Sequence, residues 1–517
     1  MENAAEKGYV LAMYTIRSKQ DYIFRSNRIL EIVGASDHIS KSWDILFEQA
    51  RDEGLMVETV STQKDAEEFD MKKVKEGFDE GKLNMVELFR GGGNDTVLYD
   101  SKDSYLKVNQ RFSRYLMENY PGMIPMAVFC EYTGDYKADY KKLMEESDRE
   151  KNRMVSGQSS FILPFSMMDR NSFQPYSRVV KYKDGSVRLT EENYQKRKKG
   201  RDIRDEELKN NPKSSVKFLD DMVTKRGEES LLAVVHADGN NMGSKISSML
   251  GNKTDYTECV RQMRKFTVDT DNAFNIEGLQ AMDKCRENLR KKYGSRFKES
   301  AFSYRKIISD GDDMTFICNA RFVMDYVQAY LKSVQTYQER HNSSWAYSSC
   351  AGICIFHGHY PFARAYSMAE QACDDGAKQK VHKVNETVEE SWMDFHYIHS
   401  GIGGNLMDIR EHQGTKDCMA RPWLVTGGNP KNKFHYDQLI RLAQLLQEYH
   451  VSRSDIKKIG SELEYSRTEA EKELPRILGH HKGLEKQLNK EFGSTEKQLK
   501  MIYDLSEIYD LWFEEGK

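Results

Sequence analysis

Three carboxylates stand close together in the stretch RKIISDGDDMTFICNA, residues 305–320. They are Asp310, Asp312 and Asp313, and apolar runs flank them on both sides. Like charges a few ångströms apart repel, so this turn destabilises a hairpin unless solvent screens the carboxylates or a cation binds them. The turn therefore predicts a cation site.

A further carboxylate, Asp238, follows the apolar run SLLAVVHA at 230–237. If the two segments are neighbouring strands, their backbones lie roughly 5 Å apart and their carboxylates can share one metal. Hard oxygen ligands at a strand edge suit Mg²⁺ or Mn²⁺, and two such ions would position an attacking hydroxyl and neutralise a leaving pyrophosphate. The predicted catalytic residues are Asp238, Asp312 and Asp313, and the predicted metal ligands are these three and Gly239.

Backbone donors for a triphosphate are predicted directly after Asp238. The segment GNNMG, residues 239–243, places two glycines before a helix, so successive N–H groups can approach an anion at the helix N-terminus. Lys378, in AEQACDDGAK, could meet the β or γ phosphate as a point charge. The predicted nucleotide-binding residues are Gly239, Asn240, Asn241, Met242, Gly243, Ser309, Gly311 and Lys378.

Each of these features also has an ordinary structural interpretation. A DGDD turn is most often a solvated loop, GNNMG is typical of a turn with a helix cap, and a lysine near a helix end complements the helix dipole. A calcium loop is disfavoured, since the alternating oxygen ligands closed by a glutamate are missing. The GNNMG segment, the DGDD turn and Lys378 nevertheless occur in order at the strand ends of one unit, and this joint occurrence favours a metal and nucleotide site.

The order of predicted elements is the same in both halves of the chain. Each half reads strand, helical region, hairpin, helix and strand, which is the split βαβ unit with helices on one face of an antiparallel sheet. After about residue 400 the strand signal disappears and apolar residues recur at helical spacing. We therefore predict an α+β fold with two ferredoxin-like (βαββαβ) domains and a C-terminal helical bundle; the resemblance described below implies that the two domains are palm domains. The predicted strands are 9–16, 83–90, 95–99 and 123–132, then 230–237, 303–309, 314–319 and 348–356; the predicted domains are 1–225, 226–400 and 401–517.

Composition narrows the possible partners and compartment. The 517 residues carry 78 Lys+Arg against 81 Asp+Glu, a net charge of −3, which argues against binding nucleic acid through overall positive charge. The eight cysteines form no CxxC pair and are predicted to be reduced, buried thiols. No leader pattern or membrane-spanning run is evident, so we expect a cytoplasmic protein with no membrane partner.

Two further segments have competing interpretations. Residues 196–213 are charged and poor in apolar residues, which predicts an exposed linker; within them KRKKGR (196–201) is more typical of solvated charge than of an RNA contact. His396 and His399 in MDFHYIHSG are spaced for a metal pair, but packing is favoured because no third ligand is evident.

At these motifs the sequence resembles the palm-domain nucleotidyl cyclases. These are the GGDEF-type diguanylate cyclases and, more closely, the large polymerase-like subunit of type III CRISPR effectors. HADGNNMG is similar to that subunit's first palm strand, SDGDDMTFI to its GGDD hairpin, and SCAGICIFHGHYPFARAYSMAEQACDDGAK to its strand followed by the AE…AK helix. IRSKQDYIFRSNRILEIVGAS (16–36) resembles its N-terminal palm, and GGGND (91–95) a degenerate form of the metal hairpin.

The resemblance implies synthesis of cyclic oligoadenylate or a cyclic dinucleotide from ATP, as a signal in antiviral defence. The reaction is attack of a 3′-hydroxyl on an α-phosphate with loss of pyrophosphate, with Mg²⁺ or Mn²⁺ as cofactor. The family's metal aspartates correspond to Asp238, Asp312 and Asp313, and its phosphate lysine to Lys378. Asp310 replaces the first glycine of GGDD, which bears on turnover or nucleotide choice. The HD nuclease and the zinc domain are absent from the sequence, so we expect a free-standing relative.

The two palms are expected to have unequal roles. Aligning the halves sets Asp238 opposite about Arg17 and Asp312–Asp313 opposite Asn94–Asp95, so the first palm is not expected to hold two metals. It is predicted to seat the acceptor nucleotide on Gly91, Gly92, Gly93 and Asn94, although these glycines could serve only for tight strand packing.

The alternative function, from a different class, is a catalytically silent palm scaffold that binds RNA, nucleotide or a partner subunit. Expected partners of the enzyme are ATP and, as further candidates, RNA or CRISPR effector subunits. Both palms lie in one chain, so a monomer suffices and a homo-oligomer stays open.

Overall fold

The structure is a computed structural model that divides into two compact units, each discontinuous in sequence. The first unit comprises residues 1–217, 241–275 and 307–312, and the second comprises 218–240, 276–306 and 313–517. The residues described are 8–60, 67–91, 93–153, 165–170, 172–182, 185–210, 222, 230–381, 389–399, 404–412, 417–427 and 434–512.

The first unit contains a five-stranded sheet with the order β2-β3-β4-β1-β5. Strand β1 runs antiparallel to both β4 and β5, and β3 pairs with β4 across the glycine hairpin. This is the predicted ferredoxin-like order, with the short β2 added at one edge. The strands are β1 (Val10–Arg17), β2 (Val57–Glu58), β3 (Met85–Gly91), β4 (Asn94–Tyr99) and β5 (Ile124–Glu131).

Helices from distant parts of the chain complete the first unit. Residues 19–52 form three helices, and α10 contributes Val260 and Met263 to the same hydrophobic core as Leu11 and Leu88. Arg264 of α10 also donates 2.6 Å to the carbonyl oxygen of Leu88. The helices are α1 (Lys19–Phe24), α2 (Ile29–Ser40), α3 (Ser42–Asp52), α5 (Met71–Asp79), α6 (Lys102–Asn119), α7 (Tyr136–Arg153), α8 (Glu191–Asn210), α9 (Met242–Leu250) and α10 (Tyr256–Asp271).

The charged segment predicted as an exposed linker forms helix α8, so that prediction is wrong over residues 196–210. The Lys196 side chain is fully buried and donates 2.5 Å to Glu192. Helix α8 packs closely on α2, because a Cβ added to Gly34 would lie 1.8 Å from the Lys196 carbonyl oxygen. A Cβ on Gly200 would lie 1.9 Å from the Leu30 carbonyl oxygen. The rest of the predicted linker, 211–213, lies outside the described residues.

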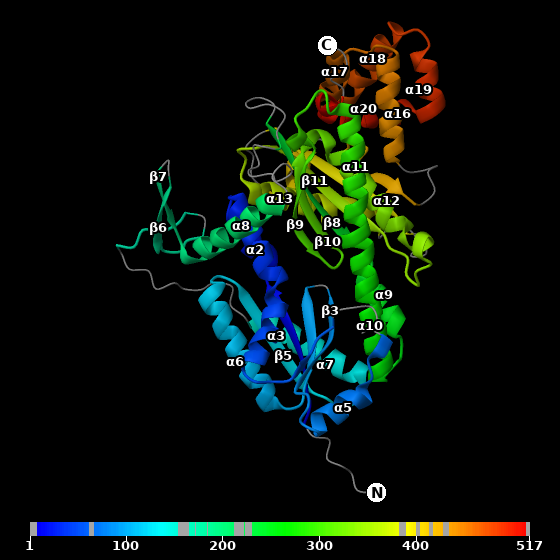
Figure 1. Ribbon diagram of the computed structural model, residues 1–517. Helices are drawn as coiled ribbons and strands as arrows, with labels where there is room; N and C mark the ends of the chain where they lie inside the picture. The colour runs from blue at the N-terminus through cyan, green and yellow to red at the C-terminus, as the bar shows by residue number, and fades with distance from the viewer. Residues whose placement is uncertain are drawn as a thin grey trace. The chain divides into compact units, whose positions relative to one another are not determined.

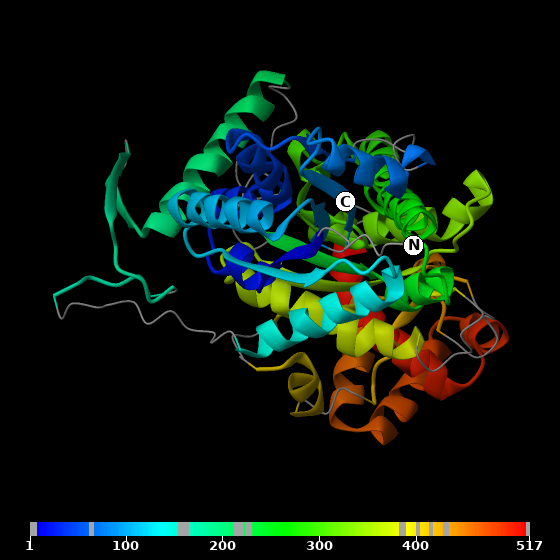
Figure 2. The same cartoon turned by 90° about the horizontal axis from the view of Figure 1, so that it is seen from below.

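A small hairpin lies outside the five-stranded sheet of the first unit and contacts α8, where Arg178 pairs with Glu191 at 2.7 Å. Strands β6 (Arg178–Tyr182) and β7 (Gly185–Leu189) pair only with each other in the described part of the chain. Figure 2 shows this hairpin projecting away from the five-stranded sheet of the same unit.

The second palm is built on a six-stranded sheet with the order β13-β12-β11-β8-β10-β9. Four of these strands, in the order β11-β8-β10-β9, again have the ferredoxin-like arrangement. Two strands extend it: β12 runs parallel to β11, and β13 pairs antiparallel with β12. The expectation that strands end by about residue 400 is therefore wrong for β13. The strands are β8 (Leu231–Gly239), β9 (Tyr304–Asp310), β10 (Asp313–Asn319), β11 (Ser349–His357), β12 (Ser391–Tyr397) and β13 (Trp423–Thr426).

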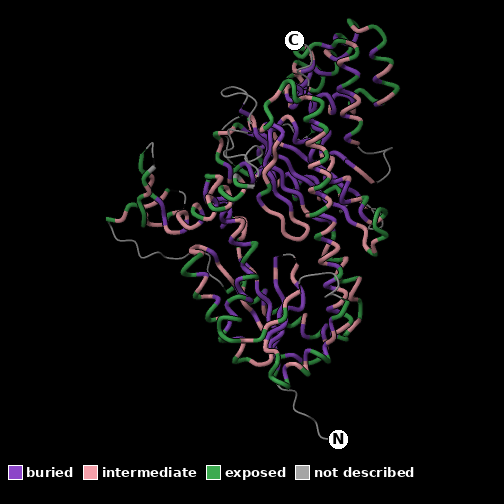
Figure 3. Tube along the Cα trace, viewed as in Figure 1, coloured by how far each residue is buried: buried purple, intermediate pink, exposed green. Residues whose placement is uncertain are grey.

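Helices cover both faces of this sheet rather than one. Helix α12 lies on the face that carries Phe316, since Tyr304 is in ring contact with both Phe316 and Tyr326 of α12. Helix α13 lies on the opposite face, where the ring of Tyr366 is 5.8 Å from that of His236. Figure 3 shows the strands between these layers as mostly buried. The helical elements are η2 (Asn272–Glu277), α11 (Gly278–Tyr293), η3 (Glu299–Phe302), η4 (Ala320–Phe322), α12 (Val323–His341), α13 (Phe362–Gln371), η5 (Ala372–Ala377) and α14 (Lys378–Val381).

The end of the chain is helical, as predicted. Helices α16 to α20 gather in the orange to red part of the ribbon (Figure 1), and buried leucines and isoleucines line their contacts. No helix among the described residues is long and apolar enough to cross a membrane. The remaining helices are α15 (Leu406–His412), α16 (Tyr436–Glu448), α17 (Arg453–Tyr465), α18 (Arg467–Gly479), α19 (Leu484–Phe492) and α20 (Thr495–Trp512).

Candidate active site

Two of the predicted catalytic aspartates lie next to each other at the end of the second-unit sheet. Strands β8 and β10 are antiparallel neighbours, with Met314 opposite Ala237. The next residues along this register are Asp313 and Asp238, so the two carboxylates start from adjacent positions on adjacent strands, roughly 5 Å apart. The prediction that these strands are neighbours is confirmed.

Lys378 joins this pair from the far end of the α13–η5–α14 segment. Its ammonium group donates to the Asp238 carboxylate and lies 3.3 Å from the carboxylate of Asp374. The side chains of Lys378 and Asp238 are 21% and 23% exposed, so a ligand can reach both. Burial lowers the pKa of Lys378 to about 8. A cationic donor thus lies beside the carboxylates of Asp238 and Asp374. The predicted role of Lys378 in binding a phosphate stays a prediction.

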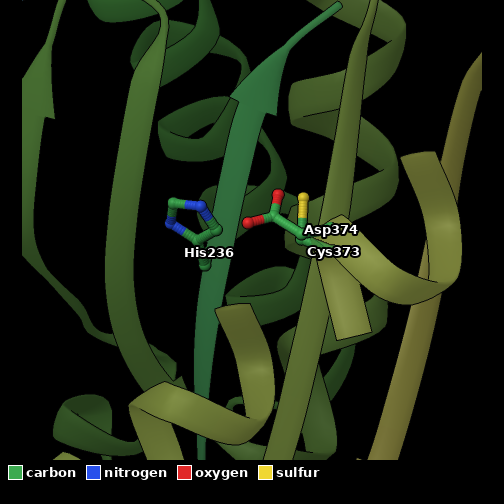
Figure 4. Close-up of side chains that lie close together, drawn as sticks. All are labelled: His236, Cys373 and Asp374. Atoms are coloured by element: carbon green, nitrogen blue, oxygen red, sulfur yellow. The ribbon is translucent and has the colours of Figure 1, made fainter. Parts of the chain in front are cut away.

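A second cluster lies one step along β8. His236 shares a face of the strand with Asp238 because side chains alternate, and Cys373 and Asp374 approach it from η5 (Figure 4). The potential ligand atoms of His236, Cys373 and Asp374 all lie within 4.8 Å of one another. Burial lowers the pKa of His236 to about 4, so its imidazole is neutral.

The residues after Asp238 hold the strand end in place. The Asn240 side chain is buried and donates 3.0 Å to both Ser348 Oγ and the carbonyl oxygen of Glu390. The Asn240 backbone N–H also donates 2.9 Å to the Ser348 carbonyl oxygen. These donors of Asn240 are therefore used within the protein, whereas Gly239 gives the strand its last residue.

Asn241, Met242 and Gly243 belong to the first unit, where they begin helix α9. Asn241 has left-handed backbone angles, φ 57° and ψ 26°, at the helix N-cap. Nothing lies within 4 Å of a Cβ built on Gly243, so its backbone is open to approach. These three residues have the local geometry expected of a loop that leads into a helix.

The tip of the β9–β10 hairpin, residues 307–312, is also part of the first unit. Asn275 holds it: its amide donates 2.9 Å to the Gly311 carbonyl oxygen, and its side-chain oxygen accepts from Ser309. Gly311 has φ 63°, which favours glycine. Asp312 follows in the turn. The predicted residues Ser309 and Gly311 are thus fixed by an asparagine that the sequence interpretation did not single out.

Asp310, which replaces a glycine of the family motif, has a basic neighbour within the first unit. Its carboxylate lies 3.4 Å from Lys19 Nζ, and the two side chains are 41% and 22% exposed. A Cβ built on Gly93 would lie 1.3 Å from the same Lys19 Nζ and 2.9 Å from the Asp310 carboxylate. Lys19 Nζ therefore lies next to both the glycine hairpin, at Gly93, and the Asp310 carboxylate.

The first palm differs from the second at the corresponding strand ends. In its sheet Thr15 lies opposite Asn94 and Tyr14 opposite Asp95, so Asn94 occupies the position of Asp313 and Thr15 that of Asp238. The alignment with Arg17 and Asn94–Asp95 was therefore shifted, because hydrogen-bond register rather than residue counting sets these positions. No carboxylate stands at either position. Asp95 is fully buried instead, which raises its pKa.

The other acceptor-site residues are glycines of this hairpin. A Cβ on Gly91 would lie 2.7 Å from the side chain of Thr267, so close packing alone accounts for this glycine. Gly93 has φ 69°. Gly92 lies outside the described residues.

A separate cavity of about 480 Å³ lies in the second unit, among residues that include His396, His399 and Arg421. Burial lowers the pKa of His396 to about 3 and that of His399 below its usual value. Among the described residues, the three-ligand cluster comprises His236, Cys373 and Asp374, and neither of these two histidines belongs to it.

The sequence interpretation missed Asn275, Lys19, His236, Cys373 and Asp374. Only His236 carried a usable signal, since it stands two residues before Asp238 on a strand and must share its face. The other four lie on helices or helical turns whose positions a single sequence does not give: Lys19 and Asn275 in the first unit, Cys373 and Asp374 in the second.

Comparison with known families identifies the segment that carries the aspartates and Lys378. Residues 231–386 match the family described as Cas10/Cmr2, second palm domain. No curated protein is significantly similar to the chain.

Solved structures resemble the chain over almost all of its length. A chain of the Csm1–Csm4 cassette in complex with pppApApA has a TM-score of 0.54 at 12% identity, covering 97% of this chain and 69% of that one. A chain of the cassette in complex with one ATP has a TM-score of 0.51 at 11% identity, covering 98% and 70%. The Csm1–Csm4 subcomplex in the type III-A CRISPR-Csm interference complex gives 0.50 at 12%, covering 97% and 70%. At these identities the likeness shows a shared fold.

Proposed function

We propose that this chain, through its Cas10/Cmr2 second palm domain, is a nucleotidyltransferase that converts ATP to a cyclic oligoadenylate or cyclic dinucleotide. In the proposed reaction a 3′-hydroxyl attacks an α-phosphate and pyrophosphate leaves. The observation that carries this proposal is the meeting of Asp238, Asp313 and Lys378 at one strand end within the matched segment.

The structural neighbours support the choice of substrate and partners. They were solved with ATP and with pppApApA, and they are assemblies of Csm1 with Csm4. We extend both to this chain as proposals: ATP is the substrate, and subunits of a type III CRISPR effector are candidate partners. The fold likeness covers the first palm as well as the second.

The residues at the strand end suit a hard dication. Asp238 and Asp313 offer carboxylate oxygens from adjacent strands, and Asp312 stands beside Asp313 in the chain. We propose that these three aspartates and the Gly239 carbonyl oxygen hold Mg²⁺ or Mn²⁺. Such ions, when bound, would neutralise charge on the reacting and leaving phosphates.

Lys378 supplies the protein's own cation. Its ammonium group already points at the carboxylate that would face the triphosphate, and a lysine binds phosphate as a point charge. Holding the phosphates in place lowers the activation barrier, because the entropy of orienting the reactants is lost on binding, before the chemical step. Gly91, Gly92, Gly93 and Asn94 are proposed to seat the ATP that provides the 3′-hydroxyl.

The proposal is tested with the purified chain, each of the four NTPs in turn, and Mg²⁺ or Mn²⁺. We expect pyrophosphate release and a cyclic product from ATP, resolved by mass spectrometry. The double substitution Asp312→Ala and Asp313→Ala should abolish both while circular dichroism stays unchanged. Asp408→Ala, at an exposed position of α15, is the matched control and should keep full activity.

Pyrophosphate production that survives in the double variant would show that these aspartates are not the catalytic ones. A wild-type chain that binds ATP but releases no pyrophosphate, alone or with type III effector subunits, would instead favour the silent scaffold.

A further inference from the structure

The cluster of His236, Cys373 and Asp374 brings a nitrogen, a sulfur and an oxygen donor together in the second unit (Figure 4). We propose that these three side chains form a binding site for one thiophilic divalent ion of the zinc class. This site is distinct from the all-oxygen aspartate site and does not depend on the proposed nucleotidyl transfer.

Local structure explains how the three donors meet. His236 lies on β8, whereas Cys373 and Asp374 are consecutive residues of η5, a π-helical turn inside the α13–α14 segment. Such turns are rare and occur often at functional sites. The close approach of η5 to the sheet depends on Gly352, where a Cβ would lie 2.3 Å from the Cys373 backbone nitrogen. Gly352 faces His236 across the β11–β8 pair.

The spacing suits a tetrahedral ion after small side-chain movements. Bonds of about 2.0–2.3 Å to nitrogen, oxygen and sulfur in a tetrahedron place ligand atoms roughly 3.3–3.6 Å apart. The three atoms here lie within 4.8 Å of one another, so shifts of about 1 Å or less in each side chain suffice. Water would take the fourth position, because three protein ligands leave one open.

The donor set decides which ion binds. A thiolate and an imidazole select Zn²⁺ or Co²⁺ over Mg²⁺, which prefers oxygen ligands. On binding, the Cys373 thiol loses its proton to solvent and its sulfur bonds to the ion. The thiol now donates 3.3 Å to the Cys350 carbonyl oxygen, and that hydrogen bond would be given up.

Neighbouring groups supply orientation and access. Thr315 Oγ1 lies 3.5 Å from His236 Nδ1, a position from which outer partners orient metal-binding histidines. Cys373 is fully buried and His236 is 5% exposed, whereas the Asp374 side chain is 50% exposed and opens the way from solvent. Lys378, 3.3 Å from Asp374, competes with the ion and limits its affinity.

The test is titration of the chelator-treated full chain with Co²⁺ in the presence of excess Mg²⁺. We expect one equivalent to bind with a thiolate-to-cobalt charge-transfer band in the near ultraviolet. The band should be retained in the Asp312→Ala and Asp313→Ala double variant and lost in Cys373→Ser. Cys354→Ser, at a fully buried cysteine of β11, should keep it.

A second variant guards against a failure to fold. Asp374→Asn changes a half-exposed side chain, and it should weaken Co²⁺ and Zn²⁺ binding at least tenfold with an unchanged melting temperature. Absence of the band in the wild-type chain, or its persistence in Cys373→Ser, would overturn the proposal. Unchanged affinity in Asp374→Asn would overturn it as well.

Discussion

The ammonium group of Lys378 contacts the carboxylate of Asp238, a residue 140 positions earlier in the chain. The helix that follows β11 continues through η5 into α14, whose first residue, Lys378, thereby lies at the end of β8. The contact joins the residue expected to bind phosphate with one expected to bind metal. Substitution of Lys378 therefore tests the proposed chemistry of the second palm directly.

Replacing Lys378 by methionine should reduce kcat/KM for ATP about 10- to 150-fold. That range corresponds to about 1.5–3 kcal/mol, the usual worth of a hydrogen bond to a charged group. Steady-state pyrophosphate release measures the effect. Lys380→Met, at an exposed neighbouring position of α14, should stay within twofold of the wild type. Equal losses in both variants would indicate a general charge effect.

Asn275→Ala should lower activity by loosening the turn that carries Asp312. The side chain links Ser309 and the Gly311 carbonyl oxygen, and each lost hydrogen bond costs about 0.5–1.5 kcal/mol. The expected result is a lower kcat with a small decrease in the free energy of unfolding, measured by urea denaturation. Asn272→Ala, one turn earlier, is the control. Wild-type kcat in the Asn275 variant would exclude a positioning role.

The Lys19–Asp310 ion pair should contribute little to stability. Both side chains are partly exposed and 3.4 Å apart, so a double-mutant cycle with Lys19→Ala and Asp310→Gly should give a coupling energy below about 1 kcal/mol. The coupling should decrease further in high salt. A coupling well above this value, insensitive to salt, would contradict the assignment of a solvent-screened pair.

Gly200→Ala should destabilise the protein, although alanine normally favours a helix over glycine. The added methyl group would lie 1.9 Å from the Leu30 carbonyl oxygen, and overpacking of this kind costs about 1–3 kcal/mol or more. Chemical denaturation measures the loss. Gly479→Ala in α18, where nothing lies within 4 Å of the new Cβ, should be neutral or stabilising. A stable Gly200 variant would disprove the tight α2–α8 contact.

Acid should weaken the second unit through His396. Burial lowers its pKa to about 3, so the folded state stays neutral while the unfolded chain binds a proton below about pH 6.5. The stability it contributes is present above pH 6.5 and decreases as the pH falls, by about 1.4 kcal/mol at pH 5.5. His396→Gln should show a correspondingly shallower pH dependence.

Comparing the wild type with His396→Gln separates the pH dependence due to His396 from that of other titratable groups. Burial raises the pKa of Asp504 to about 7, so its contribution has the opposite sign and decreases as the pH rises from about 3.8 to 7. The difference between wild type and His396→Gln cancels that effect. His412→Gln, at an exposed position, should have the same free energy of unfolding as the wild type at about pH 6.5 and about pH 5.5. Parallel pH profiles in the wild type and His396→Gln would exclude the buried neutral histidine.

The sequence by itself determined the βαββαβ order of both palms and the pairing of the strand that ends in Asp238 with β10. These follow from short-range patterns: apolar runs of strand length, a glycine turn, and a fixed strand order that makes the first and third strands neighbours. Lys378 was singled out by its place at the end of the helix that follows the last strand of the same unit and by the resemblance, and its phosphate-binding role stays a prediction.

Only the tertiary structure decided the contacts between segments that are distant in the chain and that no sequence pattern links. Lys196 lies in a stretch whose charges predict a solvated linker, yet it is buried because Glu192 neutralises it and glycines let α2 approach. Asn275, Cys373 and Asp374 reach their partners from π-helical turns, which have no sequence signature. Strand register likewise came from hydrogen bonding, since a shift of one residue changes which side chain faces the site.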